Sequence, residues 1–242
     1  MLNTEYNHVF NELQNYILDA ENIRKSLEHK IVLSRGKEVG KEAGKEVGVF
    51  FPIEKDTLFW CYYIIVNGEV KYETLTHKNI LVEKQIKIDL VSLVRQNKHI
   101  LKTYKFDTIT NIENNLANDN NINIKTFLSL CTIANLNIIY INKKTYFESL
   151  MNDTSVIYII SEVYNKYHKK YGFQLANDKI LSNIKEKLYK LDKIDKPIKA
   201  ISGYKVEELI NICSKLAIET KHKDTGKNKS KKDLYESIVQ YF

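Results

Sequence analysis

The chain has 242 residues, of which 43% are hydrophobic and 28% are charged. This balance is typical of a folded protein and too apolar for a wholly disordered one, and the length allows one large or two small domains. The sequence holds no apolar run of about 18 residues, the length of a membrane helix, and the first residues are polar. We therefore expect neither a membrane partner nor a signal peptide.

The excess positive charge lies in the last third of the chain. The formal net charge is +7; residues 163–242 carry 18 basic and 10 acidic side chains, a net of +8, which leaves a net of −1 for residues 1–162. A one-sided basic region is typical of proteins that bind a polyanion, although a solvated lysine-rich surface has the same composition.

Cysteine and histidine spacing argues against a metal centre. Cys61, Cys131 and Cys213 are 70 and 82 residues apart, and the six histidines offer no pair at helical ligand spacing. We expect no metal, no cofactor, and an intracellular, reducing compartment.

The N-terminal 49 residues form the first predicted region. Apolar residues at mostly three- and four-residue steps predict an amphipathic helix over residues 4–30. A Gly-Lys-Glu repeat follows, with glycines at 36, 40, 44 and 48. We interpret it as a loop or marginal helix, because glycine costs about 1 kcal/mol in a helix. The repeat lacks the Gly-Lys-Ser/Thr of a phosphate-binding loop, and we assign it no chemistry.

Residues 50–191 are expected to form an α+β body. The apolar run 57–66 fits either a strand ending in a hairpin at Asn67-Gly68 or a helix that begins after Asp56 and ends at Gly68, and we favour the helix. Further helices are expected over 79–102, 126–134 and 179–191, with a helix end and a polar loop over 111–123. Strands at 138–141, 145–147 and 156–160 predict a small antiparallel sheet over about 136–161. The fold class is therefore α+β, predominantly helical.

Residues 192–203 are predicted to be a linker, and residues 204–242 a small separate module. Apolar stripes predict helices over 207–218 and 231–242, joined by a polar loop. Residues 221–232 hold six lysines against Asp224. Free N–H groups at a helix start, together with lysines, favour phosphate. The candidate nucleic-acid-binding residues are Lys205, Lys221, Lys223, Lys227, Lys229, Ser230, Lys231 and Lys232.

This module resembles the SAP, Rho-N and related helix–extended-loop–helix modules. The likeness rests on Glu208-Leu209, Leu216-Ala217-Ile218, Gly226, and Ser230-Lys231-Lys232-Asp233-Leu234 through Ile238. It covers about forty residues and implies that the loop and the start of the second helix meet the DNA backbone. The loop here is several residues longer than usual, and a helical hairpin that docks on the body or on a protein partner fits the same pattern.

The body looks similar to a family of proteins encoded by nucleocytoplasmic large DNA viruses. The runs that carry the likeness are 54–64, 82–85, 124–128, 137–141 and 170–173. The resemblance would cover about 50–242 and implies an infected-cell or virion setting, with virion or host proteins as further partners. It implies no defined enzymatic role.

A fainter resemblance connects the chain with papain-like and OTU-type cysteine peptidases. It would make Cys61 the nucleophile and His168 a possible base. Cys61 lies in the run Phe59-Trp60-Cys61-Tyr62-Tyr63, which indicates burial, and the Asp-Gly-Asn-Cys pattern of active OTU enzymes is missing. We expect a structural cysteine, or an inactive descendant of such a fold.

Together these patterns predict a non-enzymatic viral protein that associates with nucleic acid, DNA rather than RNA. Residues 221–232 and the basic stretch 166–199 would make the contacts. The alternatives are a fold derived from a cysteine peptidase and a virion structural or adaptor protein without nucleic-acid contact.

Overall fold

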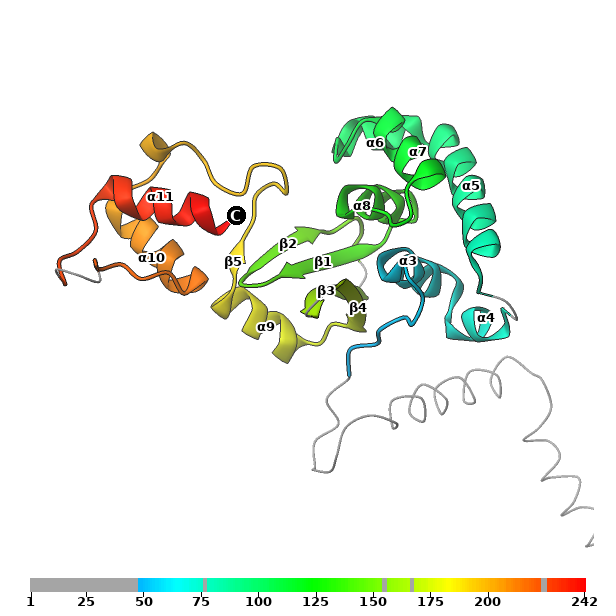
Figure 1. The fold of residues 1–242 in the computed structure, drawn as a ribbon, viewed down its shortest axis with the longest axis horizontal. Coiled ribbons are helices and arrows are strands. Elements are labelled where there is room, and N and C mark those ends of the chain that lie inside the picture. The colour runs from blue at the N-terminus through cyan, green and yellow to red at the C-terminus, as the bar shows by residue number, and fades with distance from the viewer. Residues whose placement is uncertain (1–47, 76–77, 154–155, 166–167, 223–225) are drawn as a thin grey trace, which may run out of the picture. The chain divides into compact units, whose positions relative to one another are not determined.

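A computed structural model describes residues 48–242, apart from 76–77, 154–155, 166–167 and 223–225. The predicted helix over 4–30 and nearly all of the Gly-Lys-Glu repeat lie outside the described residues. Residues Val49–Phe242 form one compact unit. The fold is α+β and largely helical, as expected, and its elements follow the colour gradient of Figure 1.

Six helices precede the sheet in the described part of the chain. Their bounds are α3 Thr57–Asn67, α4 Glu69–Thr74, α5 Ile80–Gln96, α6 Lys98–Tyr104, α7 Ile109–Asn118 and α8 Ile124–Ile133. The preference for a helix over a hairpin at 57–66 is confirmed. The Asp56 carboxylate accepts a hydrogen bond from the Phe59 amide, and Gly68 ends α3 with a φ of 84°.

The single helix expected over 79–102 is wrong, because the chain leaves the helical path at Asn97. The Asn97 side chain donates a hydrogen bond to the Leu93 carbonyl oxygen, and its φ of −108° interrupts the helix before α6 begins. Asparagine competes for backbone hydrogen bonds in this way, whereas the apolar spacing continues across it.

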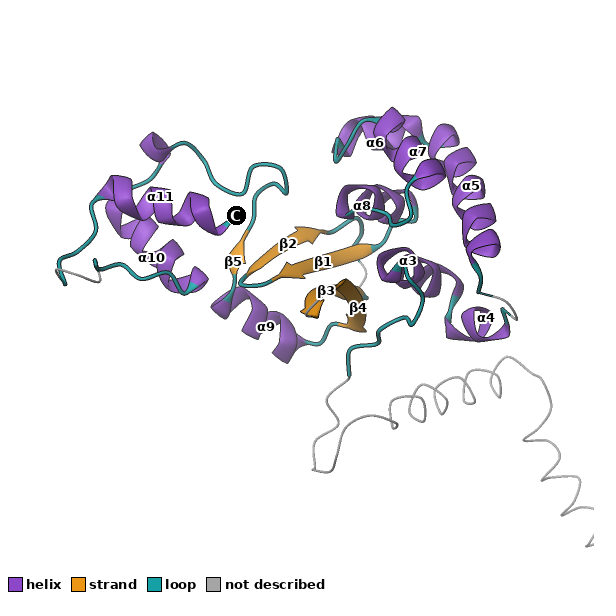
Figure 2. Cartoon of the chain, viewed as in Figure 1, coloured by secondary structure: helices purple, strands orange, loops and turns teal. Residues whose placement is uncertain are grey.

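Five strands form one mixed sheet in the order β4-β3-β1-β2-β5. They are β1 Asn137–Asn142, β2 Thr145–Ser149, β3 Ile157–Asn165, β4 His168–Leu175 and β5 Tyr189–Lys190. Figure 2 shows them between the helices. A purely antiparallel sheet over 136–161 is therefore wrong. After the β1–β2 hairpin the chain crosses back, so that β3 pairs with β1 in parallel, and β4 and β5 extend the sheet.

The sheet is covered on both faces. On one face Ile138, Tyr140, Ile160 and Phe173 join a core shared with the helices before the sheet. On the other, Ile139, Tyr146 and Ile159 pack against Ile184 of α9, Asp178–Lys187. Helix α9 ends earlier than expected, because Tyr189 and Lys190 pair with β2 instead of continuing the helix.

The outer edge of β4 is covered by the residues just before and within α3. Phe50 and Phe173 exchange two backbone hydrogen bonds. The Tyr171 amide donates to Thr57 Oγ1 at 2.9 Å, and the Cys61 thiol donates to the Tyr171 carbonyl oxygen at 3.6 Å. This covering removes an exposed sheet edge that would otherwise template aggregation.

Candidate nucleic-acid interface

The two C-terminal helices have a hydrophobic cluster of their own. Helix α10, Val206–Leu216, and helix α11, Lys231–Tyr241, bury six side chains against each other. These are Leu209, Ile212, Cys213, Leu216, Leu234 and Ile238. The apolar spacing of both helices places these residues on one stripe, so the charged residues of the C-terminal module remain outside.

The loop between the helices folds back as a narrow antiparallel turn. Lys221 and Asn228 form an isolated β-bridge, and the Lys229 amide donates to the Thr220 carbonyl oxygen at 2.9 Å. Gly226 has a φ of 64°, which a residue with a side chain adopts only with strain. The described residues on the two sides of the turn therefore lie antiparallel, and they carry Lys221, Lys227 and Lys229.

The candidate lysines differ in their exposure and in their partners. Lys205, Lys221 and Lys232 are exposed, and Lys231 is half-buried at the start of α11. The Lys229 ammonium donates instead to Ser237 Oγ at 3.0 Å, so it lies against α11. Lys227 is exposed but has an interaction partner within the protein. Lys223 lies outside the described residues.

At the start of α11, one backbone amide donates to a side-chain cap, and two amides have no hydrogen-bond acceptor within the described protein. The Asp233 amide donates to Ser230 Oγ, and the Asp233 carboxylate accepts from the Ser230 hydroxyl and amide. These hydrogen bonds from Ser230 hold the pKa of the Asp233 carboxyl below its usual value. In the described part of the chain, the amides of Lys231 and Lys232 donate to no protein acceptor. They remain available to an anion at the positive end of the helix.

The module is attached to the body at several points. The Lys144 amide donates to the Tyr241 hydroxyl oxygen at 3.1 Å, and the Tyr235 hydroxyl donates to the Lys199 carbonyl oxygen at 3.0 Å. Residues 192–203 take part as well. Ile194 packs on the core of the body, and Ile198 packs on the α10–α11 cluster.

Cys61 has the environment of a structural thiol. Its side chain is 0% exposed in the second turn of α3, and burial raises the pKa of the thiol. A nucleophilic cysteine needs a stabilised thiolate and access for substrate, and both are lacking here. The side chain of His168 lies outside the described residues, so no geometry relates it to Cys61.

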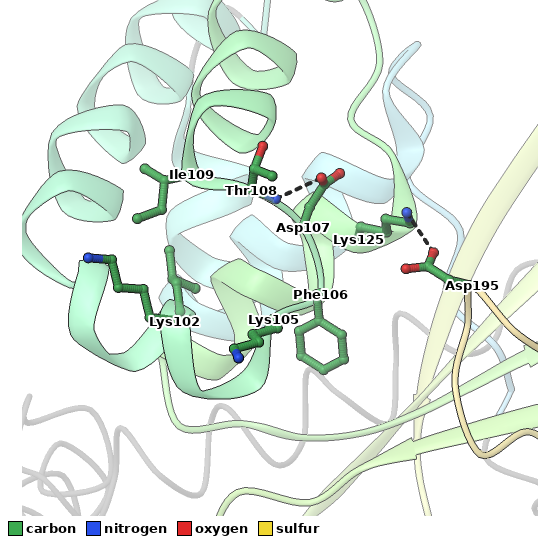
Figure 3. Close-up of a pocket in the computed structure, with 9 residues that line it drawn as sticks. Lys102, Lys105, Phe106, Asp107, Thr108, Ile109, Lys125 and Asp195 are labelled. Atoms are coloured by element: carbon green, nitrogen blue, oxygen red, sulfur yellow. Dashed lines mark hydrogen bonds and ion pairs between the residues drawn. The ribbon is translucent and has the colours of Figure 1, made fainter.

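A cavity of about 780 Å³ opens between the end of α6 and the starts of α7 and α8 (Figure 3). Lys102, Lys105 and Lys125 line it, together with Phe106 and Asp195. Lys125 and Asp195 form an ion pair at 2.6 Å. This cavity was not expected from the sequence, although the Lys102–Lys105 spacing before a polar helix start was a signal for it.

Within the described ranges, no cluster of His, Cys, Asp or Glu side chains could hold a metal ion. None of the helices in those ranges combines the length and apolarity needed to cross a membrane.

No protein-family model, curated protein or solved structure matches this chain. The resemblances to viral proteins and to SAP and Rho-N modules thus receive no support from these comparisons.

Proposed function

We propose that this protein binds nucleic acid, DNA in preference to RNA, by contacting phosphates with the α10–α11 module. The observation that carries the proposal is that Lys221 and Lys232 are exposed and Lys231 is half-buried, within ten residues of the open amides at the start of α11. Backbone N–H groups at a helix N-terminus and lysine ammonium groups both favour phosphate oxygens.

The contacts would be largely independent of sequence. Lysine acts as a flexible point charge, whereas reading a base edge usually takes the bidentate geometry of arginine, asparagine or glutamine. Affinity should therefore fall steeply with salt. Each neutralised phosphate contributes about −0.9 to the slope of log K against log salt concentration on a duplex, so these three lysines account for a slope of roughly −3.

The test is duplex binding by the full chain across a salt series, measured by fluorescence anisotropy. The key variant is Lys221→Gln/Lys231→Gln/Lys232→Gln. The matched control is Lys55→Gln/Lys84→Gln/Lys98→Gln, which removes the same charge from exposed positions outside the module. We expect the first variant to lose most of the affinity and of the salt slope, and the control to lose little.

Equal losses in the two triple variants would overturn the proposal, because they would mean that only net charge matters. A full chain that fails to bind duplex near physiological salt would overturn it too, and would favour a role as an adaptor protein.

The setting proposed with this function is a reducing compartment of an infected cell or a virion. The three cysteines are free and buried, which suits a reducing environment, and the viral setting depends only on the sequence resemblance. An antibody against the chain would test this setting, because it should detect the protein in extracts of infected cells.

A further inference from the structure

Lysine and tyrosine side chains alternate where one end of the sheet meets the end of α11. The Lys143 ammonium lies 5.9 Å from the ring centre of Tyr164 and 5.7 Å from that of Tyr241. The Lys169 ammonium lies 5.9 Å from the Tyr164 ring and 5.6 Å from the Tyr171 ring. These distances fall within the range of cation–π contacts.

The topology brings these residues together from distant parts of the chain. Tyr164 and Lys169 are direct cross-strand partners in the β3–β4 pair. Lys143 occupies the β1–β2 turn with a φ of 52°, beside the same end of β3. The C-terminus lies beside this turn in Figure 1, where the Lys144 amide holds the Tyr241 hydroxyl.

The Tyr164 ring is open to solvent. It is 56% exposed, and the Lys143 side chain beside it is exposed as well. Tyr171, in contrast, is only 7% exposed and supports the surface from beneath. A large aromatic ring left exposed between two ammonium groups offers a flat face and positive charge at one place.

A buried carboxylate holds this arrangement in place. The Glu162 side chain is completely buried, accepts a hydrogen bond from the Tyr140 hydroxyl, and pairs with the Lys169 ammonium at 2.9 Å. Hydrogen bonding to the Glu162 carboxylate raises the pKa of the Tyr164 hydroxyl to about 12.

We propose that Lys143, Tyr164, Lys169 and Tyr241 form a surface that binds single-stranded nucleic acid by stacking bases on the tyrosine rings. Base faces are available in a single strand and hidden in a duplex, and stacking on aromatic rings beside lysines is tolerant of sequence. The surface deepens the proposed function, since it predicts which form of nucleic acid the protein prefers.

The surface and the module lysines lie at opposite ends of one helix. Helix α11 has 11 residues, which corresponds to a rise of about 15 Å between Lys231 and Tyr241. One strand of a few nucleotides could therefore contact both. The two sets of residues are still separable by mutation, because they share no side chain.

The experiment compares binding of the full chain to a single-stranded oligothymidine of 20 nucleotides and to a 20-base-pair duplex. The variants are Tyr164→Ala, Tyr164→Phe and Lys143→Gln, and the matched control is Tyr104→Ala, which removes a ring that is 44% exposed elsewhere. Tyr164→Ala should lower single-strand affinity by about tenfold or more. Duplex affinity should stay within about twofold, since phosphate contacts alone serve a duplex.

The phenylalanine variant separates stacking from structural support. Tyr164→Phe keeps the ring and loses only the hydroxyl, so it should bind the single strand nearly as well as the unmodified protein. Lys143→Gln should weaken single-strand binding by a smaller factor than Tyr164→Ala. Circular dichroism of each variant checks that the fold is retained.

Three results would overturn this inference. Tyr164→Ala could leave single-strand binding unchanged, it could lower single-strand and duplex affinity equally, or the surface could bind an acidic peptide more tightly than the oligothymidine. Failure of the Lys221→Gln/Lys231→Gln/Lys232→Gln test with intact single-strand binding would instead overturn only the phosphate-binding role of the module.

Discussion

The Lys87 ammonium lies 2.7 Å from the Asp56 carboxylate, with only 2% and 1% of the two side chains exposed. The same ammonium also contacts Glu83 at 2.8 Å and the Asn120 carbonyl oxygen at 3.2 Å. Asp56 in turn accepts hydrogen bonds from the amides of Phe59 and Ile122. This buried network joins the start of α3 to α5 and to the loop before α8.

Replacing Lys87 by methionine should destabilise the protein by about 3–5 kcal/mol, because it leaves a buried carboxylate without its countercharge. Urea unfolding followed by circular dichroism measures the change. Lys84→Met on the exposed face of the same helix is the control and should have little effect. A loss below about 1 kcal/mol for Lys87→Met would contradict the expected importance of the pair.

The same variant should show a defined pH dependence. Burial raises the pKa of Asp56, and Lys87 opposes that rise, so removing Lys87 raises the pKa further. A group whose pKa is higher in the folded state loses its stabilising effect as the pH rises through that value. The destabilisation by Lys87→Met should therefore be larger at neutral than at acidic pH, and a flat difference would contradict this assignment.

All three cysteine thiols should be unreactive in the native protein. Burial raises the pKa of each of Cys61, Cys131 and Cys213. Reaction with a thiol-specific disulfide reagent should be slow in buffer and yield three equivalents in urea. Rapid native labelling of Cys61, identified by peptide mass, would reopen the cysteine peptidase interpretation.

Ser230→Ala should destabilise α11 by about 1 kcal/mol, because it removes the hydroxyl that accepts a hydrogen bond from the Asp233 amide. Hydrogen exchange should accelerate in α11 while the amides of α3 and β1 keep their protection. Ser182→Ala, in which a serine is lost from the exposed side of α9, is the control. Equal acceleration in the body would mean that the module does not open by itself.

Glu162→Gln should lower stability near neutral pH and make the acid side of the stability curve flatter. Burial alone would raise the pKa of Glu162, but hydrogen bonds from Tyr140 and Tyr164 and the Lys169 charge outweigh it, and the pKa lies below its usual 4.5. Such a group stabilises the fold above its unfolded-state pKa and ceases to do so as the pH falls through the lower folded-state value.

Thermal melts between neutral pH and pH 3 would measure the effect of Glu162→Gln. The difference from the unmodified protein should shrink as the pH falls below about 4.5. Glu186→Gln, on the exposed side of α9, is the control and should be nearly neutral throughout. A difference that persists unchanged at pH 3 would contradict the role of the ionised carboxylate.

Local sequence signals correctly predicted the helices whose capping residues and apolar spacing are visible within the helix or directly beside it. Asp56 and Gly68 mark both ends of α3, and Ser230 marks the start of α11. The apolar stripes of α10 and α11 correspond to their shared cluster. These features depend on neighbours within a few positions, so their physical causes can be found in the sequence.

The candidate lysines were identified by charge, but charge did not determine their roles. Lys229 and Lys221 belong to the same basic run, yet Lys229 donates to Ser237 while Lys221 is exposed. The β-bridge at Lys221–Asn228 sets this difference, because it fixes the direction in which each side chain leaves the turn. A count of basic residues contains no such information.

The fold class, the two ends of α3 and the basic character of the C-terminal module could be predicted from the sequence, because these follow from composition and short-range signals. The parallel pairing of β3 with β1, the burial of Lys87 beside Asp56, and the placement of Lys143 between Tyr164 and Tyr241 emerge only in the folded chain. Those pairs are separated by tens of residues, and their contacts exist only after the chain has closed the loops between them.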